Sequence, residues 1–221
     1  MTSLLVNDKG YRKYLTQEER ERFLGQSRKA KLEVYIFCRI MMETGCRISE
    51  ALNLRREHID LVQKCVYIET LKQRKKGAFR HVPISNVSLM ELMSLHEMRQ
   101  RFKEGYQDQL WDWSRMTAYR HIVSVMTQAG IAGPHASPKG LRHGFAVAAL
   151  QAGVPMNLVQ RWLGHSHWNT TAIYAEVIDA EERRFAELVW FGFRKEQSTT
   201  TVSPHHLATK KVSLASQFLA N

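Results

Sequence analysis

Apolar residues recur every three or four positions over most of the chain, which is the spacing of amphipathic helices. The sequence TQEE at residues 16–19 is a capping-box pattern, so a helix is expected to begin after Thr16. A second helix is expected over residues 28–44, ended by Gly45. Further helical patterns cover, in chain order, residues 49–54, 86–102, 114–129, 139–152, 155–163, 168–177 and 179–192.

Two segments between residues 58 and 84 break this helical spacing. The sequences HIDLVQKCVYIETL and FRHVPI are rich in β-branched and aromatic residues, which favours strands. Gly77 lies between them and suits the turn of a β-hairpin, while Pro83 stands near the far end, where a missing amide is tolerated. We therefore expect a mainly α protein with a small antiparallel β-sheet, an α+β fold.

The 221 residues fit one compact domain, and no repeat or Gly/Ser-rich linker divides their interior. We expect an N-terminal arm at residues 1–14, a folded domain at 15–194 and a flexible, polar tail at 195–221. The apolar run FAELVWFGF at residues 185–193 has two interpretations. It could dock on a second copy of the chain or pack on its own domain.

The net charge of +11 makes a polyanion the leading partner, because Lys and Arg displace condensed counterions from nucleic acid. Charge alone also fits a generally basic protein or attraction to anionic lipid. No apolar run is long enough to cross a bilayer, and the N-terminus lacks the order of a secretory signal. We expect a cytoplasmic, DNA-associated protein with no membrane partner.

Cofactor chemistry finds little support in the sequence. The three cysteines, Cys38, Cys46 and Cys65, are widely spaced, which favours neither disulfides nor a zinc ribbon. The pairs His165/His167 and His205/His206 lack further ligands at fitting spacing. No P-loop or dinucleotide fingerprint occurs. We therefore expect no metal and no cofactor.

The hairpin carries a concentration of positive charge. Residues 72–81 contain five Lys and Arg residues and no acid, namely Lys72, Arg74, Lys75, Lys76 and Arg80. Such clustering predicts contact with DNA phosphates. A solvated loop is the alternative.

Three separated motifs carry the chemistry. They are TGCRISEAL at residues 44–52, LRH at 141–143 and LGH at 163–165, and Tyr174 follows nine residues after His165. This order and spacing resemble the tyrosine recombinases, the phage-integrase family, over roughly residues 15–192. The stretch at 15–194 is then expected to be a tyrosine recombinase catalytic domain.

The resemblance implies a metal- and ATP-independent strand transferase, a site-specific DNA recombinase or integrase of the kind found in mobile elements. Tyr174 would be the nucleophile and would form a 3′-phosphotyrosine intermediate with DNA. Arg47 and Arg142 would hold the scissile phosphate, for which the planar guanidinium is well suited. His165 would donate a hydrogen bond to the same phosphate.

The two proton-transfer roles are less uniquely placed. The family has a hairpin lysine as general acid, and we prefer Lys72, which lies at the end of the outgoing strand, to Lys75, which fits when counted back from Pro83. Lys139 replaces the histidine that usually stands three residues before Arg142. A lysine acts as a base only when it is neutral, which requires a lowered pKa. His143 keeps the family's next histidine and is expected to contact DNA.

Double-stranded DNA is the partner that the resemblance implies, with dimers or tetramers forming on it. Few residues precede the first helix, as in the short recombinases that invert promoter switches, so accessory DNA-binding proteins are also expected. Two alternatives remain open at this stage. One is a non-catalytic DNA-binding regulator of the same fold, and the other is a type IB topoisomerase-like enzyme that relaxes DNA.

Overall fold

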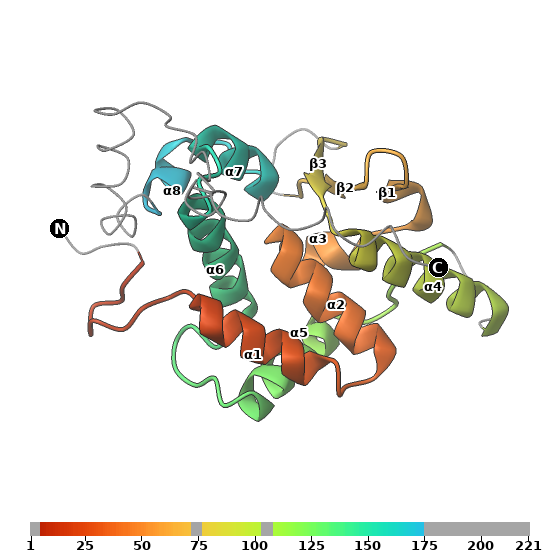
Figure 1. Cartoon of the computed structure of the whole chain (residues 1–221), viewed down its shortest axis with the longest axis horizontal. Helices are drawn as coiled ribbons and strands as arrows, with labels where there is room; N and C mark the ends of the chain where they lie inside the picture. Colours follow the sequence, from red (N-terminus) through yellow and green to blue (C-terminus); the bar gives the residue numbers. More distant parts are fainter. Residues whose placement is uncertain (1–4, 72–76, 103–107, 175–221) are drawn as a thin grey trace, which may run out of the picture. The chain divides into compact units, whose positions relative to one another are not determined.

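The computed structural model describes residues 5–71, 77–102 and 108–174 (Figure 1). Its helices are α1 (Gln17–Ser27), α2 (Leu32–Thr44), α3 (Ile48–Leu52), η1 (Arg56–His58, a 3-10 turn), α4 (Asn86–Phe102), α5 (Arg115–Gln128), α6 (Pro138–Gln151), α7 (Met156–Leu163) and α8 (Asn169–Ala172). Strands β1 (Ile59–Asp60), β2 (Cys65–Glu69) and β3 (Phe79–Pro83) form one antiparallel sheet in that order. The predicted α+β fold is confirmed.

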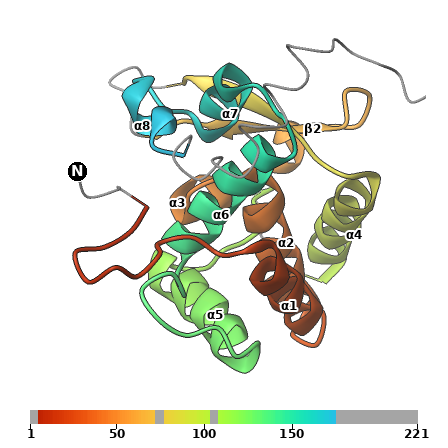
Figure 2. The ribbon, with the colours of Figure 1, turned by 60° about the vertical axis from the view of Figure 1, so that its left-hand side comes forward.

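Helix α2 is the centre of this arrangement. It packs against α1, α4 and α6, and Figure 2 shows it among the surrounding helices. Ile36, Phe37 and Ile40 on α2 are completely buried, which anchors the main apolar core. Gly45 ends the helix with a φ of 60°, and a Cβ there would lie 2.5 Å from the Phe145 ring. Only glycine therefore allows the chain to turn so close to α6.

Side-chain caps fix the ends of several helices. Thr16 and Glu19 form both bonds of the predicted capping box at the start of α1. Ser137 accepts a hydrogen bond from the Gly140 amide, so α6 begins within one residue of its predicted start. The prediction that the second helix starts at residue 28 was wrong. Residues 28–31 form the turn that ends α1, and α2 begins at Leu32.

The β2–β3 hairpin forms as predicted, with Cys65 opposite Pro83 and Glu69 opposite Phe79. The first predicted strand segment is interrupted, because a turn that includes Lys64 at a φ of 51° separates β1 from β2. Residues 72–76, which carry most of the basic cluster, lie outside the described residues.

The N-terminal residues that are described pack on a second apolar cluster. Leu5 is completely buried there with Phe145, Leu163 and Tyr174. The Lys13 amide donates a 2.7 Å hydrogen bond to the Leu5 carbonyl and closes this segment into a loop. The predicted arm therefore folds back, over its described part, beside α6 and α7.

The described residues end at Tyr174, so the helix predicted at 179–192 and the tail at 195–221 lie beyond them. Within the described part, no helix is both long and apolar enough to cross a membrane. All three cysteines are buried and unpaired. Burial raises the pKa of Cys38 to about 12 and that of Cys46 to about 11. No group of three potential metal ligands occurs among the described residues.

Candidate active site

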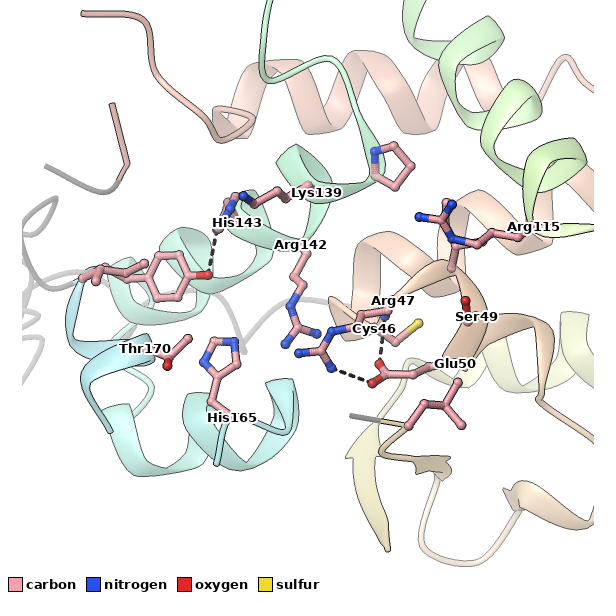
Figure 3. Close-up of a pocket in the computed structure, with 15 residues that line it drawn as sticks. Cys46, Arg47, Ser49, Glu50, Arg115, Lys139, Arg142, His143, His165 and Thr170 are labelled. Atoms are coloured by element: carbon pink, nitrogen blue, oxygen red, sulfur yellow. Dashed lines mark hydrogen bonds and ion pairs between the residues drawn. The ribbon is translucent and has the colours of Figure 1, made fainter. Parts of the chain in front are cut away.

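The three sequence motifs meet around one cavity of about 540 Å³ (Figure 3). The start of α3, the first turns of α6 and the segment from His165 to Tyr174 supply its walls. The ionisable residues that line it are Cys46, Arg47, Glu50, Arg115, Lys139, Arg142, His143, His165 and Tyr174. Five of these are basic side chains or histidines that were singled out from the sequence.

The guanidinium of Arg142 donates hydrogen bonds to two backbone carbonyls. Its Nη1 donates a 2.8 Å hydrogen bond to Gly45 and its Nη2 a 2.7 Å hydrogen bond to Leu163. Burial, and then the neighbouring charge of Arg47, lowers the pKa of this guanidinium to about 10, so it stays charged at neutral pH. A guanidinium has five N–H donors, so donors remain for a ligand in the cavity.

Arg47 lies immediately before α3 and is oriented by Glu50. Its Nη1 donates to Glu50 Oε1 at 2.6 Å, and its backbone amide donates to Oε2 at 2.9 Å. Burial alone would raise the pKa of Glu50, but the ion pairs with Arg80 and Arg47 keep that pKa below its ordinary value. The carboxylate is therefore charged, and it directs Arg47 toward Arg142 (Figure 3).

His165 follows the turn that ends α7. Gly164 adopts a φ of 67° at this turn, and the His165 amide donates to the Gln160 carbonyl. The ring Nδ1 lies 2.9 Å from Thr171 Oγ1. Burial, followed by the charges of Arg142 and Arg47, lowers the pKa of His165 to about 3. The ring is neutral at pH 7 and has one N–H to donate.

Tyr174 is 1% exposed, and its hydroxyl lies 2.7 Å from His143 Nδ1. Its ring is parallel to that of His165, with centroids 6.4 Å apart. Burial raises the pKa of Tyr174 to about 12, although Arg142 and Arg47 act in the opposite direction. Burial, and then Lys139 and Arg142, lowers the pKa of His143 to about 4. The two groups therefore form a neutral pair at pH 7.

This geometry suits an oxyanion with an oxygen nucleophile beside it. Two arginines and a neutral histidine surround space in which an anion would receive several charge-assisted hydrogen bonds. A hydroxyl at the same cavity is the nucleophile that could attack the atom bearing those oxygens.

A family model described as the phage integrase family matches residues 13–181. The chain belongs to the phage integrase family. The match includes all three motifs and every residue that lines the cavity. The resemblance drawn from the motifs is thereby confirmed.

Individual phage integrase family members agree with this assignment. The chain is 29% identical to the tyrosine recombinase XerA of Pyrococcus furiosus over 170 residues, which are 75% of this chain and 57% of the relative. It is 35% identical to XerD of Neisseria meningitidis over 146 residues, or 62% and 48% of the two chains. The chain thus spans about half the length of these relatives.

A solved structure of another member, the XerH site-specific recombinase bound to palindromic difH substrate, matches with a TM-score of 0.66. Its sequence is 25% identical, and the match covers 80% of this chain and 53% of XerH. The fold that surrounds the cavity is therefore that of the family's solved members.

The structure brings together Arg47, Arg142, His165 and Tyr174, as the family pattern predicts. Lys139 also lines the cavity but is exposed at its edge. The other predicted basic residues, Lys72, Arg74, Lys75 and Lys76, lie outside the described residues.

Two predicted DNA contacts are placed differently. Arg80 is only 6% exposed, and its guanidinium donates hydrogen bonds to Trp162, Thr70 and Glu50, so its predicted contact with DNA stays a prediction. The reason for its burial is strand alternation: Phe79 and His81 face outward, whereas Arg80 and Val82 face inward. His143 is buried too, and it binds the Tyr174 hydroxyl.

Sequence reasoning gave no role to Glu50 or to Arg115. Glu50 stands three residues after Arg47, a helix-start spacing that could have signalled their pairing. Arg115 opens α5 and is exposed at the edge of the cavity. The position of Arg115 at the cavity depends on the tertiary packing of α5 against α3, which no local sequence pattern indicates.

Proposed function

We propose that the protein is a site-specific DNA recombinase or integrase that cleaves and rejoins DNA through a 3′-phosphotyrosine at Tyr174. The observation that carries this proposal is the convergence of Arg47, Arg142, His165 and Tyr174 on one cavity. Because the chain spans only about half of its relatives, their whole activity is carried over here as a proposal.

In the proposed reaction, Arg47 and Arg142 bind the nonbridging oxygens of the scissile phosphate, and His165 donates its N–H to them. The Tyr174 oxygen forms a bond to phosphorus while the bond to the 5′-oxygen breaks. The 5′-oxygen leaves with the electron pair and takes a proton from Lys72 or Lys75. The new phosphotyrosyl ester retains the energy of the broken phosphodiester bond, so the 5′-hydroxyl of another strand can attack it, form a new phosphodiester bond and release Tyr174.

The proton of Tyr174 has two candidate acceptors. Lys139 is the family-based choice and is exposed at the cavity edge. His143 already lies 2.7 Å from the hydroxyl, and its low pKa keeps it neutral and able to accept. The contact geometry favours His143 for the first transfer, with Lys139 next to it on α6.

Double-stranded DNA is the proposed substrate. Support comes from family membership, the net charge of +11 and the difH complex of XerH. Strand exchange between two duplexes needs several active sites, so we also propose that copies of the chain assemble on DNA. Accessory DNA-binding proteins would increase the affinity for DNA and select the target sequence, because phosphate contacts position a protein without specifying sequence.

The proposed chemistry is tested by covalent capture of DNA. Nicked duplexes with randomised sequence are incubated with the protein, and the mixture is then denatured. The DNA that remains attached to the protein is sequenced. The wild type is expected to retain DNA, and the nick makes attachment irreversible because the short fragment that carries the new 5′-hydroxyl dissociates. Tyr174→Phe is the matched control because it keeps the buried ring and removes only the hydroxyl.

The outcomes separate the alternatives. Capture by Tyr174→Phe would exclude Tyr174 as the nucleophile. Specific binding without capture by the wild type would identify a non-catalytic DNA-binding regulator. If the protein relaxes supercoiled plasmid that carries a captured site but never exchanges strands between two such sites, it is a type IB topoisomerase-like enzyme.

A further inference from the structure

Arg80 connects two walls of the cavity without lining it. From strand β3 its Nη2 donates to Glu50 Oε2 at 2.7 Å, and its Nε donates to the Trp162 carbonyl at 2.7 Å. Its Nη1 donates to Thr70 Oγ1 at 2.9 Å. We infer that Arg80 is a positioning residue for the cleavage reaction, acting on Arg47 through Glu50 and on His165 through the end of α7. This inference rests on the proposed function.

The link to Arg47 runs through one completely buried carboxylate. The Glu50 side chain is 0% exposed and divides its oxygens between the two arginines. Arg47, Arg80 and Glu50 together carry one net positive charge. Without Arg80, the remaining Arg47–Glu50 pair would be neutral, and Glu50 would be held by Arg47 alone. The charge that Arg47 presents to a phosphate therefore depends on Arg80.

The link to His165 runs through the last turn of α7. Carbonyls at a helix C-terminus have no partner within the helix. Here Arg80 binds the Trp162 carbonyl and Arg142 binds the Leu163 carbonyl. A Cβ at Gly164 would lie 3.0 Å from Arg80 Nη1, so the guanidinium packs directly against the turn. The backbone leading into His165 is thus fixed by two arginines.

The bond to Thr70 extends the same network to the hairpin. Thr70 follows β2 and its amide binds the Ala78 carbonyl, so it closes the described base of the hairpin. A single guanidinium therefore joins the parts of the chain that supply Arg47 and His165 to the described base of the hairpin.

The first test measures cleavage and binding separately. Arg80→Gln is expected to slow single-turnover cleavage about tenfold or more, as misplaced catalytic groups do, while DNA affinity changes by less than about twofold. Arg80→Lys, which keeps the charge near Glu50, is expected to recover part of the rate. The matched control is Arg39→Gln, another buried arginine, which pairs with Glu43 and Ser88 away from the cavity. It should lower stability and leave the cleavage rate of folded protein unchanged.

A double-mutant cycle distinguishes positioning from a general structural role. In an Arg47→Lys background, Arg80→Gln is expected to cost clearly less than it does in the wild type, because the part of its effect that passes through Glu50 to Arg47 is already lost. Rate losses that simply multiply would overturn the inference and leave the proposed function intact.

A spectroscopic measurement keeps the inference testable even if no DNA is cleaved. Nitrogen-15 NMR of arginine side chains is expected to show a slowly exchanging Arg47 guanidinium in the wild type. Arg80→Gln should broaden or shift that signal, whereas Arg39→Gln should not. An Arg47 signal that is unchanged by Arg80→Gln would refute the positioning role, while absence of cleavage by the wild type would refute only the proposed function.

Discussion

At the scale of single residues, the cavity keeps its histidines neutral in a basic environment. Folded-state pKa values of about 4 for His143 and about 3 for His165 lie below the value of about 6.5 expected in an unfolded chain. As the pH falls through 6.5, the two histidines therefore bind protons in the unfolded state but not in the folded state. Stability is full above that pH and is lost as the pH falls toward the folded pKa values.

We predict that the DNA-free protein is less stable at pH 5 than at pH 7, by up to about 2 kcal/mol for each histidine. Partial solvent access to His165 makes its share smaller than this limit. Urea unfolding at the two pH values measures the difference.

His143→Gln serves as the control for this pH effect. It removes one titrating group and should reduce the loss between pH 7 and pH 5. Glu50 contributes little to the change in stability between pH 7 and pH 5. Its depressed pKa affects stability only as the pH approaches the pKa of a carboxyl group in the unfolded chain. Equal stability of the wild type at both pH values would contradict the neutral state inferred for the two rings.

At the scale of elements, α6 matters most because it carries Lys139, Arg142 and His143. Gly140 on its first turn lies so close to the preceding loop that a Cβ would stand 1.8 Å from the His135 carbonyl oxygen. We predict that Gly140→Ala lowers the free energy of unfolding by about 3 kcal/mol, the upper end of usual overpacking costs. Chemical denaturation gives the value.

Gly25→Ala is the matched comparison. Gly25 lies within α1, and a Cβ there would meet nothing within 4 Å. Alanine should stabilise this helix by about 0.5–1 kcal/mol through its higher propensity. Opposite signs for the two substitutions are expected, and a stabilising Gly140→Ala would show that α6 is not held against the loop as described.

What the sequence predicted well was local. The cap Thr16 was visible as a residue type with Glu19 three positions later, and it lies at the start of α1. The start of α2 was missed because Lys31, its N-cap residue, makes no side-chain cap hydrogen bond.

The cavity was predictable only in part. The spacing of the family motifs identified Arg47, Arg142, His165 and Tyr174, which the fold brings together. The burial of Arg80 depends on Glu50, a partner 30 residues away, and no local pattern reports such a pairing. The contact between His143 and Tyr174 spans 31 residues and is hidden for the same reason.

At the scale of the whole molecule, the net charge of +11 predicts strongly salt-dependent DNA binding. If roughly six cationic groups contact phosphates, affinity should fall about a thousandfold between roughly 50 and 200 mM salt. Titration of a captured target site at several salt concentrations gives the slope. A slope near zero would contradict phosphate contacts as the main source of affinity.

The burial of Leu5 bears on how far the chain can be shortened. Leu5 and Tyr174 belong to the same apolar cluster, although 169 positions separate them. A version that began at Leu15 would keep the main core but would expose apolar surface next to Tyr174. Under the proposed function, a shortened version must therefore keep the segment that contains Leu5 in order to keep Tyr174 buried in its present surroundings.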